Sequence, residues 1–305
     1  MTSIIIPTWN AARQIGGLLT ALKSQTVQCE IIVIDSSSSD ATADIAVSLG
    51  AEVLSVARKS FGHGETRALA AQQARGSILV YFTQDAVPCN EHAVKNLLTA
   101  FQDHTVAAAY GRQVPCPEAT AFAAHLRLFN YPEISCVRSI MDKERYGIRT
   151  PFLSNSFAAY RKNVLKNIGG FRKKMIMGED TCAGAELLLA GYKIAYVADA
   201  AVYHSHNLTV REEFKRYFDI GVFHTREQWV LEAFGNAEGE GRRYVASEVR
   251  YLAKRGKMHL LPELLVRNCL KYAGYRLGRN YRKIPRSLIG KISLHRDWWD
   301  SGTQG

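Results

Sequence analysis

Short apolar runs alternate with amphipathic segments along the first two hundred residues. Residues 3–8 and 30–35 are runs of β-branched residues that stop at polar turn residues, as is typical of strands buried on both faces of a parallel sheet. Residues 11–25 lie between them and carry leucine and isoleucine at helical spacing. The pattern therefore predicts a βαβ unit at the N-terminus.

The same alternation predicts an α/β fold up to about residue 206. The expected strands cover residues 52–56, 77–82, 107–111, 152–161, 193–197 and 201–204. The expected helices cover residues 41–49, 65–75, 91–101, 163–168 and 181–189. Residues 112–150 receive no assignment, because three prolines interrupt the helical patterns there.

From residue 210 the pattern becomes helical, with basic and aromatic side chains. Residues 235–241 suggest a linker, and residues 242–296 suggest two or three basic helices broken near Pro262 and Pro285. We therefore expect one domain over residues 1–235 and a basic helical region over residues 236–305.

Composition and charge narrow the class of protein. The chain has 305 residues, of which 47% are apolar and 22% charged, as in soluble globular proteins. We see no bilayer-spanning apolar run and no signal-peptide pattern, so we expect a cytoplasmic protein. The six cysteines are scattered, which predicts reduced thiols.

The net charge of +11 is concentrated at the C-terminus. Residues 241–305 hold 15 Lys and Arg against 4 Asp and Glu, which accounts for the whole excess. Such a segment can bind nucleic acid, an anionic membrane or a partner protein, or it can be a solvated helical face. We favour contact with a membrane surface.

Polar residues follow the first two strands at the edge where open α/β sheets bind ligands. Pro7, Thr8 and Asn10 stand where a dinucleotide-binding protein would have its glycine-rich loop. After the second strand, Asp35 is suited to accept from a pyrimidine imide or ribose hydroxyls. Asp40 is suited to cap the helix that begins at residue 41.

Two further groups carry candidate chemistry. Glu179 and Asp180 stand at the start of a predicted helix, where a carboxylate can act as a general base or can simply cap the helix. His204 and His206 are two residues apart at a strand end, so in an extended chain both face one side and can bind a metal. The alternative is a pair of surface histidines in a turn.

These motifs resemble family 2 glycosyltransferases of the GT-A fold, between about residues 3 and 206. The Pro-Thr-aromatic-Asn segment at residues 7–10 and the Asp-x-x-Ser-x-Asp segment at residues 35–40 carry the resemblance. Within that family, Phe-x-His-Gly-x-Thr-Arg at residues 61–67, Thr-Gln-Asp-Ala at 83–86 and His-Ser-His at 204–206 are similar to bacterial rhamnosyltransferases that use dTDP-L-rhamnose.

The resemblance implies a GT-A domain with a mixed, mostly parallel sheet, and a role for each candidate residue. Asp180 would be the base and Glu179 its orienter, while Asp85, His204 and His206 would hold Mg²⁺ or Mn²⁺. Asp85 is the one carboxylate left of the family's Asp-x-Asp pattern. The nucleotide-sugar would contact Pro7, Thr8, Asn10, Asp35, Ser36, His63, Arg67 and Gln84.

The implied activity is an inverting transfer of L-rhamnose, or a related deoxysugar, from a dTDP donor to a saccharide acceptor, lipid-linked in bacterial surface polysaccharide assembly. The enzyme would work at the inner face of the cell membrane. The alternatives are a UDP- or GDP-sugar donor, nucleotidyl transfer on a similar core, and a nucleic-acid-binding protein that uses its basic tail. Nucleotidyl transfer would call for a glycine-rich loop with Lys after the first strand, which the sequence lacks.

Overall fold

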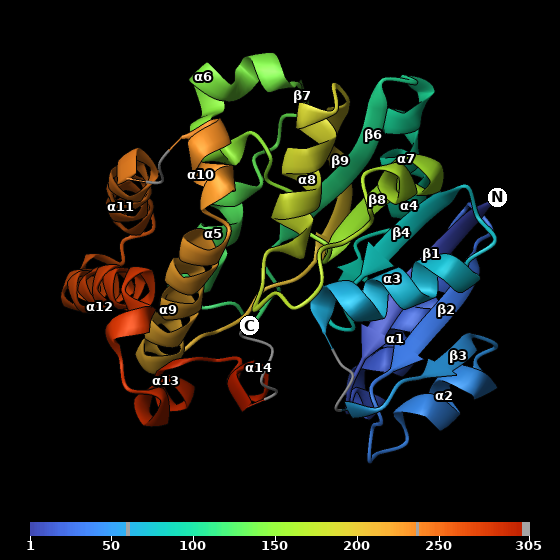
Figure 1. Cartoon of the computed structure of the whole chain (residues 1–305), viewed down its shortest axis with the longest axis horizontal. Helices are drawn as coiled ribbons and strands as arrows, with labels where there is room; N and C mark the ends of the chain where they lie inside the picture. The colour runs from blue at the N-terminus through green and yellow to red at the C-terminus, as the bar shows by residue number, and fades with distance from the viewer. Residues whose placement is uncertain (59–61, 236–237, 301–305) are drawn as a thin grey trace.

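The computed structural model describes residues 1–58, 62–235 and 238–300 (Figure 1). Its centre is a nine-stranded sheet with the order β3-β2-β1-β4-β8-β6-β9-β5, and β7 pairs with β9. The strands are β1 (Thr2–Thr8), β2 (Glu30–Asp35), β3 (Glu52–Ser55), β4 (Ile78–Phe82), β5 (Val87–Pro88), β6 (Val106–Val114), β7 (Cys136–Arg138), β8 (Phe157–Arg161) and β9 (Lys193–Tyr203).

Helices cover both faces of this sheet (Figure 1). The first group is α1 (Ala12–Lys23), α2 (Thr42–Ser48), α3 (His63–Gln73), α4 (Ala93–Leu98), α5 (Ala121–Asn130), α6 (Lys143–Tyr146), α7 (Lys162–Asn167) and α8 (Glu179–Leu189). The second group is α9 (Val210–Arg226), α10 (Gln228–Phe234), α11 (Glu238–Lys254), α12 (Leu261–Arg279), α13 (Arg286–Ile292) and α14 (Arg296–Asp300). Short 3-10 helices are η2 (Thr99–Gln102), η3 (Ile140–Asp142), η4 (Gly147–Arg149), η5 (Met258–Leu260) and η6 (Tyr281–Lys283).

The strands have the burial that their composition predicts. Ile4, Ile5 and Ile6 of β1 are all fully buried. Ile4 and Ile6 pack into one hydrophobic cluster, and Ile5 packs into the other, on the opposite face of the sheet. Alternate side chains therefore enter two cores, which explains why this strand is an uninterrupted apolar run.

One strand runs against its neighbours in the middle of the sheet. β8 pairs antiparallel with both β4 and β6, whereas β1 pairs parallel with β2 and β4, and β6 pairs parallel with β9. The prediction of an α/β fold with a mixed, mostly parallel sheet is confirmed.

Several predicted boundaries are wrong. The strand expected over residues 152–161 begins only at Phe157, and the two strands expected over 193–204 are one strand, β9, with a register shift opposite Gly111 and Arg112. The linker expected over residues 235–241 is helical from Glu238, where α11 begins. The breaks near Pro262 and Pro285 are confirmed as the starts of α12 and α13.

The C-terminal helices pack closely on the rest of the chain, and α12 lies against α9. A Cβ atom at Gly278 would lie 2.0 Å from the carbonyl oxygen of Phe218, and one at Gly274 would lie 2.4 Å from that of Phe214. Tyr281 and Ile289 also join the hydrophobic cluster that contains Ile5. The division of the chain into domains at residue 235 stays a prediction.

Replacing Gly278 by alanine should therefore destabilise the protein. The new Cβ must push α9 and α12 apart, and such overpacking costs about 1–3 kcal/mol. We expect urea unfolding to show a lower midpoint for Gly278→Ala. The matched control is Gly241→Ala in α11, where nothing lies within 4 Å of the added Cβ. That control should be neutral or stabilising by up to about 1 kcal/mol, and an equal loss in both variants would contradict the packing argument.

Candidate functional site

The loops after β1 and β2 are joined by hydrogen bonds at the carboxyl edge of the sheet. Thr8 lies opposite Asp35 in the parallel pairing, and its Oγ1 is 3.4 Å from Oδ1 of Asp35. Asn10 has a φ of 48°, a left-handed conformation that asparagine tolerates, and its Oδ1 accepts the backbone N–H of Ser39 at 2.9 Å. The sequence-predicted residues Thr8, Asn10 and Asp35 therefore lie together.

Two of the predicted nucleotide contacts, Asp35 and Gln84, accept hydrogen bonds from the backbone of the protein. Asp35 accepts the backbone N–H of Ser38 at 2.9 Å, and Oε1 of Gln84 accepts that of Trp9 at 2.9 Å. The Ser36 side chain has no exposed surface. Pro7 lies within β1 opposite Ile34. The nucleotide-binding roles of these residues stay predictions.

Asp40 caps helices, as its sequence position suggests. Its Oδ1 accepts the backbone N–H of Thr42, the first residue of α2, at 3.1 Å. Its Oδ2 accepts the backbone N–H of Ala12, the first residue of α1, at 3.1 Å. The hydrogen bond from the Thr42 hydroxyl is the largest of the effects that lower the pKa of Asp40.

Asp85, His204 and His206 converge at the ends of β4 and β9. Nε2 of His204 lies 3.4 Å from Oδ1 of Asp85, and Nε2 of His206 lies 3.5 Å from Oδ2. One ligand atom from each residue lies within 4.8 Å of the others. Asp85 and the two histidines are 119 and 121 positions apart in the sequence, so the fold brings them together as predicted.

Gln113 orients His204 within this cluster. Nη1 of Arg127 lies 2.8 Å from Oε1 of Gln113, and because a guanidinium can only donate, it identifies that atom as the amide oxygen. The same oxygen lies 2.9 Å from Nδ1 of His204, which must then carry the proton. The lone pair of His204 therefore sits on Nε2 and faces Asp85.

The protonation states of the cluster suit a divalent cation. Burial lowers the pKa of both histidines, that of His206 to about 4, so both imidazoles are neutral near pH 7. Burial opposes ionisation of Asp85, but in acid, where the two histidines become protonated, a hydrogen bond from His204 and the charges of both rings hold the pKa of Asp85 below its ordinary value, so this carboxylate is charged near pH 7. Two imidazoles and one carboxylate fit Mn²⁺ better than Mg²⁺, which prefers oxygen ligands.

Asn155 holds the two acidic residues at the start of α8. Its backbone N–H donates to Oδ2 of Asp180 at 3.1 Å, and its Nδ2 donates to Oε1 of Glu179 at 3.2 Å. The same Glu179 oxygen lies 3.0 Å from Nη1 of Arg67, in a buried ion pair. Arg67, which we predicted to contact the nucleotide-sugar, thus contacts the residue beside the predicted base.

The pKa of Asp180 is raised above its ordinary value. Burial is the main cause, and the neighbouring charge of Glu179 adds to it. Hydrogen bonds from the backbone N–H groups of Asn155 and Thr181, and the charge of Arg67, oppose the shift only in part. A carboxylate whose pKa moves toward neutrality is a stronger base than an ordinary aspartate.

Gly178 forms the turn that leads into Glu179 and Asp180. It has a φ of 82°, in the left-handed region that favours glycine, directly before α8. A Cβ here would also lie 2.6 Å from the ring of Phe223 in α9. The segment before α8 is therefore packed directly against α9.

A hydrogen-bond path that the sequence did not predict joins the two groups. Nε2 of Gln113 donates to Oγ of Ser154 at 2.9 Å, and the next residue is Asn155. Asn155 is buried, and its Oδ1 accepts the hydroxyl of Tyr160 at 2.8 Å. One hydrogen-bonded scaffold therefore holds both the metal-type cluster, which is the set of Asp85, His204 and His206, and the acid pair of Glu179 and Asp180.

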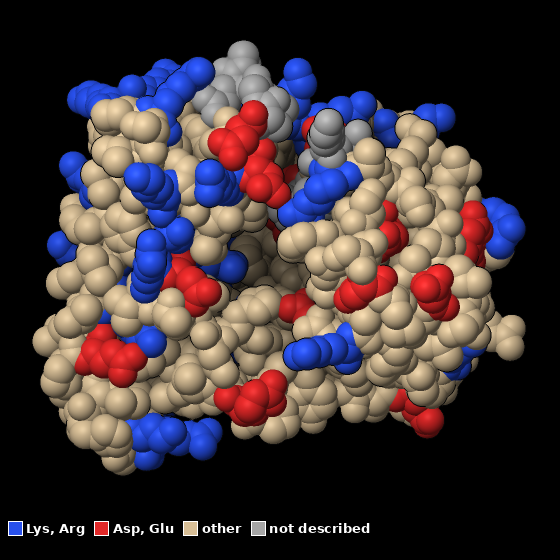
Figure 2. All heavy atoms as spheres, turned by 90° about the horizontal axis from the view of Figure 1, so that it is seen from below, with Lys and Arg blue, Asp and Glu red and all other residues tan. Residues whose placement is uncertain are grey.

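Figure 2 shows the face seen from below in Figure 1, and this face is hollowed near its middle, with both acidic and basic side chains around the hollow.

His63, another predicted contact, begins α3, but its side chain lies outside the described part of the structure, as does Phe61 of the same motif. The six cysteines are unpaired, as expected.

The glycosyl transferase family 2 model matches residues 3–169, which is more than half of the chain. The chain is a member of glycosyl transferase family 2. This confirms the predicted family and the prediction of a glycosyltransferase, as opposed to a nucleotidyltransferase or a nucleic-acid-binding protein.

Two curated relatives match this family 2 glycosyltransferase over nearly its whole length. The O-antigen chain rhamnosyltransferase RfbN of Salmonella typhimurium is 42% identical over 302 residues, covering 98% of this chain and 96% of the relative. The O-antigen chain rhamnosyltransferase WbaN of Salmonella anatum is 41% identical with the same coverage.

Solved structures share the fold of this family 2 glycosyltransferase. The mannosyltransferase PcManGT from Pyrobaculum calidifontis, in complex with GDP-Man and Mn²⁺, has a TM-score of 0.60 at 17% identity, covering 98% of this chain and 85% of that one. S. aureus TarS 1-349 has a TM-score of 0.56 at 19% identity, covering 92% and 91%. These likenesses confirm the GT-A fold.

The scaffold around His204 predicts how metal affinity depends on Gln113. The Gln113→Leu variant removes the acceptor for the Nδ1 proton of His204, and loss of such a partner weakens metal binding by about 10- to 100-fold. Gln113→Glu keeps an acceptor and should retain affinity. Titration calorimetry with Mn²⁺ measures both, and exposed His104→Ala is the control. Equal Mn²⁺ affinity in Gln113→Leu and the wild type would contradict the assignment.

Proposed function

We propose that this glycosyltransferase transfers L-rhamnose, with inversion, from a dTDP donor to a lipid-linked saccharide acceptor during O-antigen assembly. The observation that carries the proposal is 42% identity to an O-antigen chain rhamnosyltransferase over 98% of the chain. The motifs at residues 61–67, 83–86 and 204–206 resemble dTDP-L-rhamnose enzymes and support the donor. A UDP- or GDP-sugar donor is the alternative.

The donor would lie along the carboxyl edge of β1, β2 and β4. Thr8, Asn10 and Asp35 would contact the nucleoside, and the cluster of Asp85, His204 and His206 would face its diphosphate. A divalent cation bound there would neutralise charge on the departing nucleotide. Nε2 of His204 presents its lone pair to that position, because Gln113 holds the proton on Nδ1.

Asp180 would take the proton from the acceptor hydroxyl as it attacks. Its Oδ2 is held by the Asn155 backbone N–H at 3.1 Å and its Oδ1 by the Thr181 backbone N–H at 2.7 Å, so the carboxylate cannot swing away freely. Glu179 is fixed by Arg67 and Asn155 and raises the basicity of Asp180 through its charge. A single base of this kind is what an inverting transfer requires.

The base assignment predicts a loss of rate and a specific pH profile. Asp180→Asn should lower kcat by about 10²- to 10⁴-fold while leaving donor affinity unchanged. Because the pKa of Asp180 is raised, wild-type kcat/KM should fall as the pH drops through a value above that of an ordinary aspartate.

The assay follows transfer of radiolabelled rhamnose from dTDP-L-rhamnose to a lipid extract, with UDP- and GDP-sugars as comparison donors. The control is Asp103→Asn, because Asp103 is exposed and lies far from Asp180 in the sequence. Product formed only from a UDP- or GDP-sugar would overturn the donor assignment, and a fully active Asp180→Asn enzyme would overturn the base.

We also expect the C-terminal helices to contact an anionic membrane surface. No helix in the described part of the chain combines the length and hydropathy that a bilayer-spanning segment requires. The side of α12 turned away from α9 nevertheless exposes Leu265 (61%), Val266 (52%) and Tyr272 (64%). An apolar helix face within a strongly basic region matches the chemistry of an anionic lipid surface.

The double variant Leu265→Asp/Tyr272→Asp should bind anionic vesicles more weakly, by about tenfold or more, because it replaces apolar contacts with charges that the lipid repels. Flotation with vesicles that contain phosphatidylglycerol measures the effect at two salt concentrations. Leu189→Asp, on an exposed leucine of α8 (54%), is the control. Vesicle binding by the double variant equal to that of the control would contradict this surface.

A further inference from the structure

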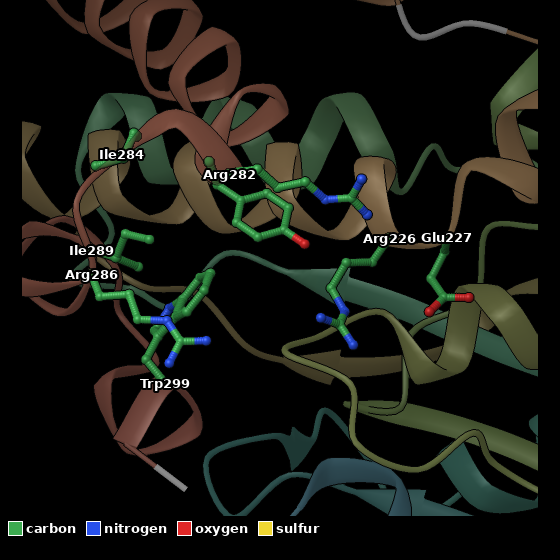
Figure 3. Close-up of a pocket in the computed structure, with 8 residues that line it drawn as sticks. Arg226, Glu227, Arg282, Ile284, Arg286, Ile289 and Trp299 are labelled. Carbon is green, nitrogen blue, oxygen red and sulfur yellow. The ribbon is translucent and has the colours of Figure 1, made fainter. Parts of the chain in front are cut away.

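A basic cavity lies between the end of α9 and the C-terminal helices, and it uses none of the residues of the site described above. It has a volume of about 470 Å³, within the range of small-molecule sites. Arg226, Arg282 and Arg286 line it, together with Ile284, Ile289 and Trp299. In Figure 3, Arg226 and Arg286 reach into the cavity from opposite sides, and Trp299 lies next to Arg286. Glu227 and Tyr281 complete the lining, so the wall combines three cations and one carboxylate with apolar and aromatic side chains.

The charge of this cavity is not balanced by the protein. Among the described residues, no carboxylate lies within 4 Å of the guanidinium groups of Arg226, Arg282 or Arg286. Glu227 also lines the cavity, but its Oε2 already lies 3.0 Å from Nη1 of Arg172 and accepts Nε1–H of Trp229 at 2.8 Å. Three clustered cations therefore face a space that an anion would fill favourably.

A second cavity adjoins the first and is also lined by both cationic and apolar side chains. It shares Arg286, Ile289 and Trp299 with the first and adds Lys291 and Arg296. Asp300 is its acidic residue, and it lies 3.5 Å from Nε of Arg296. The combined groove suits a ligand that has a multiply charged anionic group joined to an apolar chain.

Two contacts link the groove to the segment that precedes the predicted base. Phe223, whose ring packs on Gly178, lies one helical turn before Arg226 in α9. Trp298, on which Arg226 stacks at 5.1 Å, donates Nε1–H to the carbonyl oxygen of Lys174 at 3.3 Å. Lys174 and Gly178 both belong to the segment that leads into Glu179 and Asp180. The groove is therefore packed against the segment that positions the predicted base.

We infer that this groove binds the lipid carrier that bears the acceptor saccharide, through a diphosphate and the first part of the apolar chain joined to it. The inference rests on the proposed function for the identity of the acceptor. Arg226, Arg282 and Arg286 contact the diphosphate, and Ile284, Ile289 and Trp299 contact the apolar chain. The same enzyme then recognises its acceptor through the carrier as well as through the sugar.

Two acceptors that differ only in the aglycone test the inference. One is the acceptor saccharide on farnesyl diphosphate, and the other is the same saccharide on an uncharged alkyl chain. Arg282→Ala/Arg286→Ala should raise the KM for the diphosphate acceptor by about 10- to 100-fold and leave the KM for the alkyl acceptor and for the donor unchanged. Lys283→Ala removes a neighbouring exposed charge outside the groove and should change none of these values. Equal changes for the two acceptors would overturn the inference.

A binding measurement separates this inference from the proposed function. Calorimetry with farnesyl diphosphate, in the presence of dTDP and Mn²⁺, should show binding to the wild type and to Lys283→Ala, and a loss of at least tenfold in the double variant. Farnesol should bind weakly to all three. If the protein binds farnesyl diphosphate through these arginines but has no rhamnosyltransferase activity, the groove assignment is supported and only the proposed function is wrong.

The last arm distinguishes the carrier from bilayer phospholipid. The double variant should float with phosphatidylglycerol vesicles about as well as Lys283→Ala. If it instead loses vesicle binding while farnesyl diphosphate affinity stays at the wild-type level, the groove binds phospholipid headgroups and the inference is wrong. A melting temperature equal to that of the wild type confirms that both variants are folded.

Discussion

The site depends on the direction of one strand. β8 runs antiparallel between β4 and β6, so the residues that enter it lie at the edge where its two neighbours end. Phe157 pairs with Phe82, only three residues before Asp85, which places Ser154 and Asn155 beside the metal-type cluster. If β8 were parallel, these residues would lie at the opposite edge, about five residues or 17 Å away.

The pKa values of the two aspartates in the site are shifted in opposite directions. Asp85 has its pKa lowered by two histidines, and Asp180 has its pKa raised by burial and by Glu179. One carboxylate is therefore kept charged, as cation binding requires, and the other is made basic, as proton abstraction requires. Separation of carboxylate pKa values by environment is a general way for one site to combine two roles. The scaffold of Gln113, Ser154 and Asn155 connects the two environments.

Residues at strand and helix ends could be predicted from the sequence, and residues whose role depends on sheet order could not. Asp85, His204 and His206 follow apolar runs in a recognisable motif order, and the structure brings them together. Gln113 and Asn155 are single polar residues, and nothing local indicates that they face the same edge, because the reversal of β8 is a property of the whole sheet. Arg67 was predicted to contact the nucleotide-sugar, yet it pairs with Glu179, which is 112 residues away in the sequence.

The start of α11 shows how tertiary packing overrides local preference. Gly235, Gly239 and Gly241 suggest a linker by propensity alone. The helix nevertheless begins at Glu238, because its later residue Leu252 is buried with Phe122 of α5 and Leu264 of α12. A short window of sequence contains no sign of these distant partners.

The glycine contacts between α9 and α12 have a consequence for engineering. α9 touches the segment before the base through Phe223, touches α12 through Gly278, and contributes Arg226 to the basic groove. Because the backbone of α9 meets Gly274 and Gly278 of α12 directly, and side-chain ion pairs such as Arg267–Glu213 join the same two helices, neither helix can be exchanged alone. A chimera that borrows the acceptor preference of a relative should therefore take everything from Thr209 onward, so that α9 travels with the helices it fits.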